Sequence, residues 1–137
     1  MLVLDTNVYI DASQDSDRAK LITSIVDDIG DAVGLHSVVA AELVAGGSSL
    51  GGRSEFVQRL MRVAKGVVTP IHDDWTFAGN ALRLLGADAV TTRRSFWNDL
   101  LIATSCARGG VTLLTNNQAD FARIRRTIPV DILALPN

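Results

Sequence analysis

Short apolar runs alternate with segments of helical periodicity along the whole chain, and this alternation restricts the fold more than any other feature. The apolar runs occupy residues 2–4, 32–35, 67–71, 111–114 and 130–135. Between them, apolar residues recur every three or four positions, which is typical of amphipathic helices. Strands that alternate with helices predict a parallel sheet with right-handed crossovers and helices on both faces. We therefore expect an α/β fold, a three-layer α/β/α sandwich with a central parallel sheet.

The helical segments have recognisable ends. The spacing predicts helices over residues 17–29, 38–45, 53–65 and 99–108, one from residue 73 or 74 to about 85, and another that starts near residue 120. Gly30, Gly46–Gly47 and Gly109–Gly110 are expected to end three of them. Ser37 and Asn98 are expected to cap the helices over 38–45 and 99–108. Residues 5–7 should form a polar turn after the first strand, and residues 46–52 a glycine-rich loop.

Composition indicates one globular domain over residues 1–137. The chain is large enough to bury about two-thirds of its unfolded surface, and 47% of its residues are hydrophobic. Its single cysteine, Cys106, cannot form an internal disulfide, and no apolar run is long enough to span a bilayer. A start without the features of a signal peptide completes the case for a cytoplasmic protein.

Charge alone does not identify a binding partner. The net charge of -2 argues against a broad positive field for nucleic acid. However, 11 of the 13 basic residues are Arg, which suits bidentate contacts with phosphate. A GC-rich genome would give the same bias, so both explanations stay open.

Acidic residues stand at positions that one edge of the sheet can gather. Asp5 directly follows the first strand, and Asp120 ends the polar loop after the strand at 111–114. Ligands of open parallel sheets bind beyond the carboxyl ends of the strands. Asp99, expected in the first turn of its helix, can reach this edge through a right-handed crossover. Glu42 lies in an otherwise apolar helix, where an unpaired acid is costly to bury.

Converging carboxylates require a counter-charge. Two like charges about 4 Å apart repel by roughly 4 kcal/mol at an effective dielectric near 20. His36, His72 and Cys106 do not accompany the acids, so the ligand set is all oxygen, which favours Mg²⁺ or Mn²⁺ over Zn²⁺. Such cations polarise phosphoryl oxygens and generate hydroxide from bound water. The acids therefore point to phosphodiester hydrolysis.

Each acid also has a purely structural explanation. Asp5 can form a turn, Asp99 can favour the positive end of a helix, and Asp120 can cap one. Glu42 can face the solvent. The case for a site is that all four fall where a single fold would bring them together.

Four segments of the chain each carry one of these acids. They are Leu2–Asn7, Ser37–Leu43, Asn98–Ala103 and Thr115–Phe121. Together they resemble the PIN domain family, and specifically the VapC-type toxins of bacterial and archaeal toxin-antitoxin pairs. The likeness spans essentially the whole chain. It departs from many relatives at Asn117, where they carry an acid.

The resemblance implies a single PIN-like nuclease domain, acting as a Mg²⁺- or Mn²⁺-dependent endoribonuclease that leaves 5′-phosphate and 3′-hydroxyl ends. It assigns metal binding to Asp5 and Asp99, with Glu42 and Asp120 completing the shell. It also implies an RNA substrate, a homodimer and a cognate antitoxin that occupies the cleft. The supporting residues are Thr6, Asn7, Thr115 and Asn117, with Thr115 expected to bond Asp5 or the loop backbone.

Three interpretations remain open at this stage. Arg93 and Arg94, beside the Asp99 helix, are candidates for RNA backbone contacts or part of a solvated loop. An Asp-dependent phosphatase also starts with a strand that ends in Asp, but it usually has a second Asp where this chain has Asn7. A non-enzymatic alternative is an interaction domain of the same fold with a weak or silent site.

Overall fold

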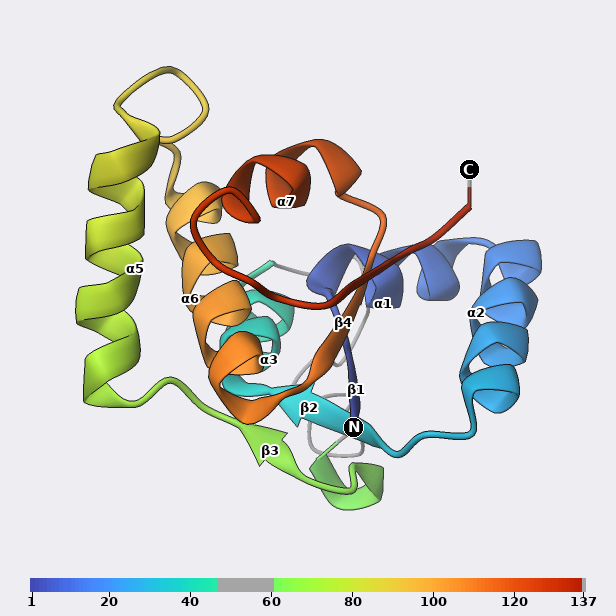
Figure 1. The fold of residues 1–137 in the computed structure, drawn as a ribbon. Coiled ribbons are helices and arrows are strands. Elements are labelled where there is room, and N and C mark those ends of the chain that lie inside the picture. Colours follow the sequence, from blue (N-terminus) through green and yellow to red (C-terminus); the bar gives the residue numbers. More distant parts are fainter. Residues whose placement is uncertain (47–60, 137) are drawn as a thin grey trace.

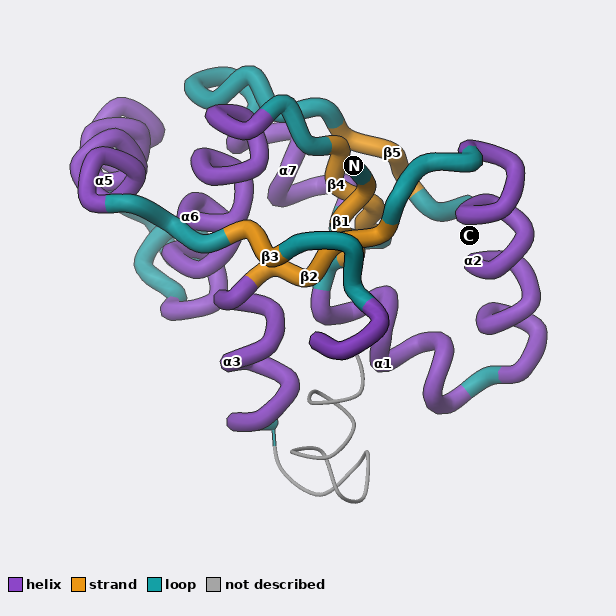
Figure 2. Tube along the Cα trace, turned by 90° about the horizontal axis from the view of Figure 1, so that it is seen from below, coloured by secondary structure: helices purple, strands orange, loops and turns teal. Residues whose placement is uncertain are grey.

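The computed structural model describes residues 1–46 and 61–136, and in that part of the chain five strands form one parallel sheet (Figures 1 and 2). The strands are β1 (Leu2–Leu4), β2 (Val33–His36), β3 (Val67–Val68), β4 (Thr112–Thr115) and β5 (Ile132–Ala134). The helices are α1 (Thr6–Gln14), α2 (Ser16–Ile29), α3 (Ser37–Ala45), α5 (His72–Leu85), α6 (Arg94–Gly109) and α7 (Gln118–Ile124). The prediction of an α/β fold with a central parallel sheet is confirmed.

Alternate side chains of β1 point into two separate cores. Val3 packs in the larger core with residues of α3, α5, α6 and α7. Leu2 and Leu4 pack in the smaller core with Val8 of α1 and Ile22 of α2. This is the period-two alternation of a strand that is buried on both faces. Figures 1 and 2 show α5 and α6 on one side of the sheet and α2 on the other, so the fold has three layers.

The strand order places a topological switch next to β1. The order is β3-β2-β1-β4-β5, so the chain builds β2 and β3 on one side of β1 and then crosses to build β4 and β5 on the other. β1 pairs directly with β4, with Val3 opposite Leu113. In open parallel sheets the crevice for a ligand lies at this reversal, beyond the carboxyl ends of the strands.

The first and third helices begin earlier than the sequence predicts. In place of a polar turn, α1 starts at Thr6 and is capped by Asp5, whose Oδ1 accepts the Thr6 amide at 2.8 Å. Helix α3 is capped by His36 rather than by Ser37, because His36 Nδ1 accepts the amide of Val38 at 3.0 Å. At both places the helix follows the strand directly, without a connecting loop.

Helix α6 also begins one turn early, and this moves a candidate site residue. It starts at Arg94, so Asn98 does not cap it and Asp99 lies in the second turn rather than the first. The reason is that Phe96 and Leu100, four residues apart, are both fully buried and extend the apolar face N-terminally. Helix-dipole stabilisation fades beyond the first turn, so it does not account for an acid at Asp99.

The remaining predictions fare as follows. Helix α2 ends at Gly30, whose φ of 64° is the left-handed conformation expected of a glycine stop. β3 is two residues long, shorter than the predicted run at 67–71, and lies at the sheet edge two residues before Pro70.

The helix predicted over 53–65 and the loop over 46–52 fall mostly on residues 47–60, outside the described residues. In the described part of the chain, no helix is both long and apolar enough to span a bilayer. The single-domain and cytoplasmic assignments stay predictions.

A fully buried histidine joins the end of β2 to α6. Because its Nδ1 accepts the Val38 amide, Nε2 of His36 carries the proton and donates to Ser105 Oγ at 2.6 Å. Ser105 in turn donates to the carbonyl of Leu101 at 2.6 Å. Burial lowers the pKa of His36 to about 4, and the charge of Asp74 opposes this only in part.

We expect His36 to make the fold acid-sensitive. Below pH 6.5 the unfolded chain binds a proton at this residue, but the folded chain does so only near pH 4. Stability is therefore fully present above pH 6.5 and falls, by about 2 to 3 kcal/mol, as the pH drops towards 4. Urea unfolding of wild type and His36→Asn between pH 7.5 and 4.5 measures this. Equal pH slopes for the two proteins would contradict it.

Candidate active site

The four acids predicted from the sequence come together at the carboxyl ends of β1 and β4. Asp5 follows β1, Glu42 lies in α3, Asp99 lies in α6, and Asp120 is in the first turn of α7. The negative charges of the other three act on Asp99, which places each of them within electrostatic range of Asp99. The fold thus gathers acids from four separated segments at its topological switch.

Asp5 is held by hydrogen bonds on both carboxylate oxygens. Its side chain is almost fully buried, at 3% exposure. Oδ1 accepts the Thr6 amide, while Oδ2 accepts Thr115 Oγ1 at 2.7 Å and Asn7 Nδ2 at 3.1 Å. The Thr115 contact is the one expected from the sequence. Burial nevertheless raises the pKa of Asp5, because it outweighs these donors.

Glu42 has polar partners that sequence reasoning missed. Thr6 Oγ1 donates to its Oε1 at 2.8 Å, and Asn98 Nδ2 lies 3.5 Å from Oε2. These partners come from α1 and α6, so the apolar neighbours of Glu42 in its own helix gave no hint of them. Burial, and to a smaller extent the charge of Asp5, raises the pKa of Glu42.

One amide bridges the two remaining acids. Asn117 Nδ2 lies 3.4 Å from Asp99 Oδ2 and 3.1 Å from Asp120 Oδ2. Arg93 forms an ion pair with Asp120 at 3.3 Å. The loop after β4 therefore places a neutral donor between two carboxylates.

The charges of the site are poorly compensated around Asp99. Burial raises the pKa of Asp99 to about 8, assisted by the negative charges of Asp5, Glu42 and Asp120 and opposed by Arg93. An ionised carboxylate that is 8% exposed among like charges needs either a proton or a cation. The site thus has the electrostatics of a cation-binding centre.

The donor set fits a hard cation that keeps part of its water shell. The available ligands are carboxylate oxygens with hydroxyl and amide groups around them, the ligand type that Mg²⁺ and Mn²⁺ prefer. Within residues 1–46 and 61–136, no three His, Cys, Asp or Glu side chains lie close enough to form a cage by themselves. Mg²⁺ commonly binds through one or two carboxylates and several waters, so this open arrangement suits it.

A further polar network, also missed from the sequence, supports Asn7 from the outer side. Asn7 Oδ1 accepts the backbone amide of Asn116 at 3.3 Å, and Asn116 Nδ2 donates to Asp11 Oδ2 at 2.6 Å. Asp11 also lies 3.6 Å from Arg18. Asparagine in a loop after a strand was the available signal, but its partners depend on how α1 meets that loop.

The two arginines at the start of α6 have different surroundings. Arg93 is paired with Asp120 and so partly neutralises the site. In the described part of the chain, the side chain of Arg94 makes no ion pair or hydrogen bond. Arg94 is therefore the freer of the two to meet an external phosphate.

Asn117→Asp is expected to weaken the cation-free fold and tighten cation binding. The change replaces a bridging donor by a third carboxylate, which should lower the free energy of unfolding in EDTA by about 1 to 2 kcal/mol. The added charge should lower the Kd for Mn²⁺ about tenfold. Thermal unfolding with EDTA and across a Mn²⁺ titration measures both effects. Asn80→Asp, which adds the same charge at an exposed site of α5, is the matched control; the same Mn²⁺ affinity in both variants would refute the expectation.

Comparison with known proteins identifies a family pattern and similar folds. A family model described as PIN domain matches residues 2–127. Among curated proteins no significant match was found. Solved structures with the same fold include VapBC-1 from nontypeable Haemophilus influenzae, at 21% identity and a TM-score of 0.72 over 97% of this chain and 96% of that one.

Two further structures resemble this fold along nearly their whole length. DNA-bound VapBC from Salmonella typhimurium gives 17% identity and a TM-score of 0.70, covering 97% of this chain and 96% of that chain. VapBC2 from Rickettsia felis, bound to a DNA fragment from its promoter, gives 18% identity and a TM-score of 0.66, with 98% of each chain covered.

Proposed function

Because this chain belongs to the PIN domain family, we propose that it is a Mg²⁺- or Mn²⁺-dependent endoribonuclease. The observation that supports this best is the surroundings of Asp99, a buried carboxylate at the switch point among three other acids. Such a charge distribution destabilises the fold unless a cation is bound. A metal-dependent nuclease needs such a cation for catalysis, and the acids are the groups that bind it.

The residues have separable roles in this proposal. Asp5 and Asp99 hold the cation, and Glu42 and Asp120 complete its shell directly or through water. When bound, the cation polarises a phosphoryl oxygen and lowers the pKa of an attacking water. The chain's own contribution is to fix the orientation of each carboxylate.

Neighbouring side chains supply that orientation. Thr115 and Asn7 fix Oδ2 of Asp5, and Thr6 fixes one oxygen of Glu42. The side-chain amide of Asn117 donates to the carboxylates of both Asp99 and Asp120 and so fixes their positions relative to each other. Partners of this kind typically change metal affinity or activity 10- to 100-fold when removed.

The biological role proposed is that of a toxin in a toxin-antitoxin pair. The support is the similarity of the fold to chains of VapBC structures. We propose that a small cognate antitoxin blocks the acidic site and that the chain forms a homodimer. Co-expression with the product of a neighbouring short reading frame should abolish RNA cleavage, and size-exclusion chromatography should give a dimer. A monomer at all concentrations would count against the dimer.

The nuclease proposal is tested by incubating the purified protein with structured and single-stranded RNAs. Cleavage is expected with Mg²⁺ or Mn²⁺ but not with EDTA, and the products should carry 5′-phosphate and 3′-hydroxyl ends. Asp5→Ala should be inactive, whereas Asp131→Asn, a change at an exposed acid before β5, should be as active as wild type. Absence of cleavage by wild type, or equal cleavage by Asp5→Ala, would exclude the nuclease. Release of phosphate from a phosphomonoester instead would support the phosphatase alternative.

A further inference from the structure

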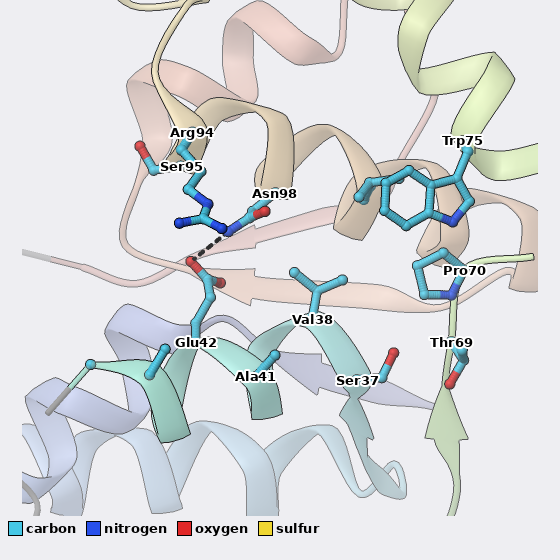
Figure 3. Close-up of a pocket in the computed structure, with 13 residues that line it drawn as sticks. Ser37, Val38, Ala41, Glu42, Thr69, Pro70, Trp75, Arg94, Ser95 and Asn98 are labelled. Atoms are coloured by element: carbon cyan, nitrogen blue, oxygen red, sulfur yellow. Dashed lines mark hydrogen bonds between the residues drawn. The ribbon is translucent and has the colours of Figure 1, made fainter.

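A groove of about 690 Å³ opens beside the acidic site and shares Glu42 with it. Its walls come from α3, from the segment between β3 and α5, from Trp75 in the first turn of α5, and from the first turns of α6. Figure 3 shows Arg94 and Asn98 facing Glu42 at one end and Trp75 above Pro70 at the other. The groove therefore runs from the candidate reaction centre to an aromatic side chain.

The two ends of the groove differ in chemistry. Near Glu42 the lining includes Arg94, whose guanidinium has no partner in the described residues. Every ion pair of the described arginines lies elsewhere. At the far end Trp75 is 49% exposed, with its indole tilted by 44° against Trp97 at 6.2 Å. An arginine without an ion-pair partner among residues 1–46 and 61–136 and a large exposed aromatic thus border the same cavity.

These two features match the chemistry of single-stranded nucleic acid. A free guanidinium contacts phosphate, and an exposed indole stacks on an unpaired base of any sequence. Helix α3, which lines the groove, has nine residues and a length of about 13 Å. Successive nucleotides in a stacked strand are roughly 3.4 Å apart, so a few of them fit alongside it.

We propose that this groove binds the single-stranded RNA segment next to the scissile phosphate, with Arg94 on a backbone phosphate and Trp75 stacked on a base. The inference rests on the proposed function. It adds Trp75 as an RNA-contacting residue and gives Arg94 a defined phosphate contact. A base in a duplex is already stacked and paired, so it cannot reach Trp75. The enzyme should therefore cut unpaired segments and spare fully paired ones.

Binding is measured first, without catalysis, using a fluorescein-labelled single-stranded RNA oligonucleotide and the Asp99→Asn protein. Trp75→Ala should weaken binding roughly fivefold or more, while Trp75→Phe keeps most of the affinity because phenylalanine also stacks. Arg94→Gln should reduce the slope of log K against log salt by about 0.7. In a Trp97→Phe background Trp75 is the remaining tryptophan, and RNA should quench its fluorescence.

Matched controls come from the same surfaces. Phe77, two residues along α5 and 51% exposed, lies outside the groove, and Phe77→Ala should leave RNA affinity unchanged. Arg125→Gln removes an exposed arginine at the end of α7 in the same way. In the active protein, Trp75→Ala and Arg94→Gln should raise KM several-fold and change kcat little.

The outcomes separate this inference from the proposed function. If wild type cleaves RNA but neither variant changes KM or affinity, the groove proposal is wrong and the nuclease stands. If the oligonucleotide binds through Trp75 and Arg94 but is never cut, the groove proposal stands and the nuclease is wrong. If Trp75→Ala instead turns a dimer into a monomer with unchanged RNA affinity, the groove is a protein interface and the proposal is overturned.

Discussion

Asp99→Asn is expected to lose more than roughly 100-fold in RNA cleavage while becoming more stable than wild type without a cation. The loss follows because changing residues that merely orient metal ligands already costs 10- to 100-fold. The gain follows because the variant keeps the side-chain shape and removes a buried charge that Asp5, Glu42 and Asp120 repel. We expect an increase of about 1 to 2 kcal/mol in the free energy of unfolding in EDTA.

The sign of this gain depends on pH. Asp99 has a folded-state pKa of about 8, above its ordinary value of 3.8. As pH rises through this interval the unfolded chain loses the proton before the folded chain does, so stability without a cation falls. The advantage of Asp99→Asn should therefore be largest near pH 8 and vanish near pH 4.

Urea unfolding with EDTA and with Mg²⁺ distinguishes the two effects. Mg²⁺ at 100 times its Kd should stabilise wild type by about 2.7 kcal/mol and the variant much less. Asp131→Asn, at an exposed acid outside the site, should match wild type in both conditions. A variant that loses cleavage and also unfolds more readily in EDTA would show that Asp99 supports the fold, contrary to the assignment.

Phe96→Ala is expected to destabilise the protein by about 3 to 5 kcal/mol, the largest effect foreseen on the fold. Phe96 is 0% exposed and packs in the larger core, three residues before Asp99. Removing its ring leaves a cavity that the surrounding helices fill only in part. Because this ring anchors the first turn of α6, cleavage should also decline in the part of the protein that remains folded.

Equilibrium urea unfolding measures this change, with Phe77→Ala as the matched control. Phe77 is 51% exposed on α5, and its removal should alter stability by about 0.5 kcal/mol or less. Similar losses for the two variants would mean that the first turn of α6 is not anchored by burial of Phe96.

The positions of Asp5 and Asp120 could be foreseen because each follows an apolar strand, and the carboxyl ends of parallel strands share one edge. The start of α6 could not. Asn98 is a good capping residue in isolation, but burial of Phe96 favours a helix that begins a turn earlier. Tertiary packing overrides local capping preference here, as it commonly does.

The partners of the site residues were less accessible to sequence reasoning than the acids themselves. Glu42 is held by Thr6 and Asn98, which are 36 and 56 residues away along the chain. Trp75 of α5 lines the same groove as Glu42, 33 residues before it in the chain. Such contacts depend on how helices and strands pack against one another. Periodicity and capping motifs describe single elements and do not predict this packing.

The double use of Asp5 has an evolutionary consequence. One carboxylate oxygen caps α1, and the other is held towards the acidic cluster by Thr115. Asparagine caps helices about as well as aspartate, and the codons of the two residues differ by one base. On the proposed toxin function, a single transition at this codon would therefore remove the charge of the site and keep the cap of α1. Selection against the proposed toxicity should then favour Asn at residue 5.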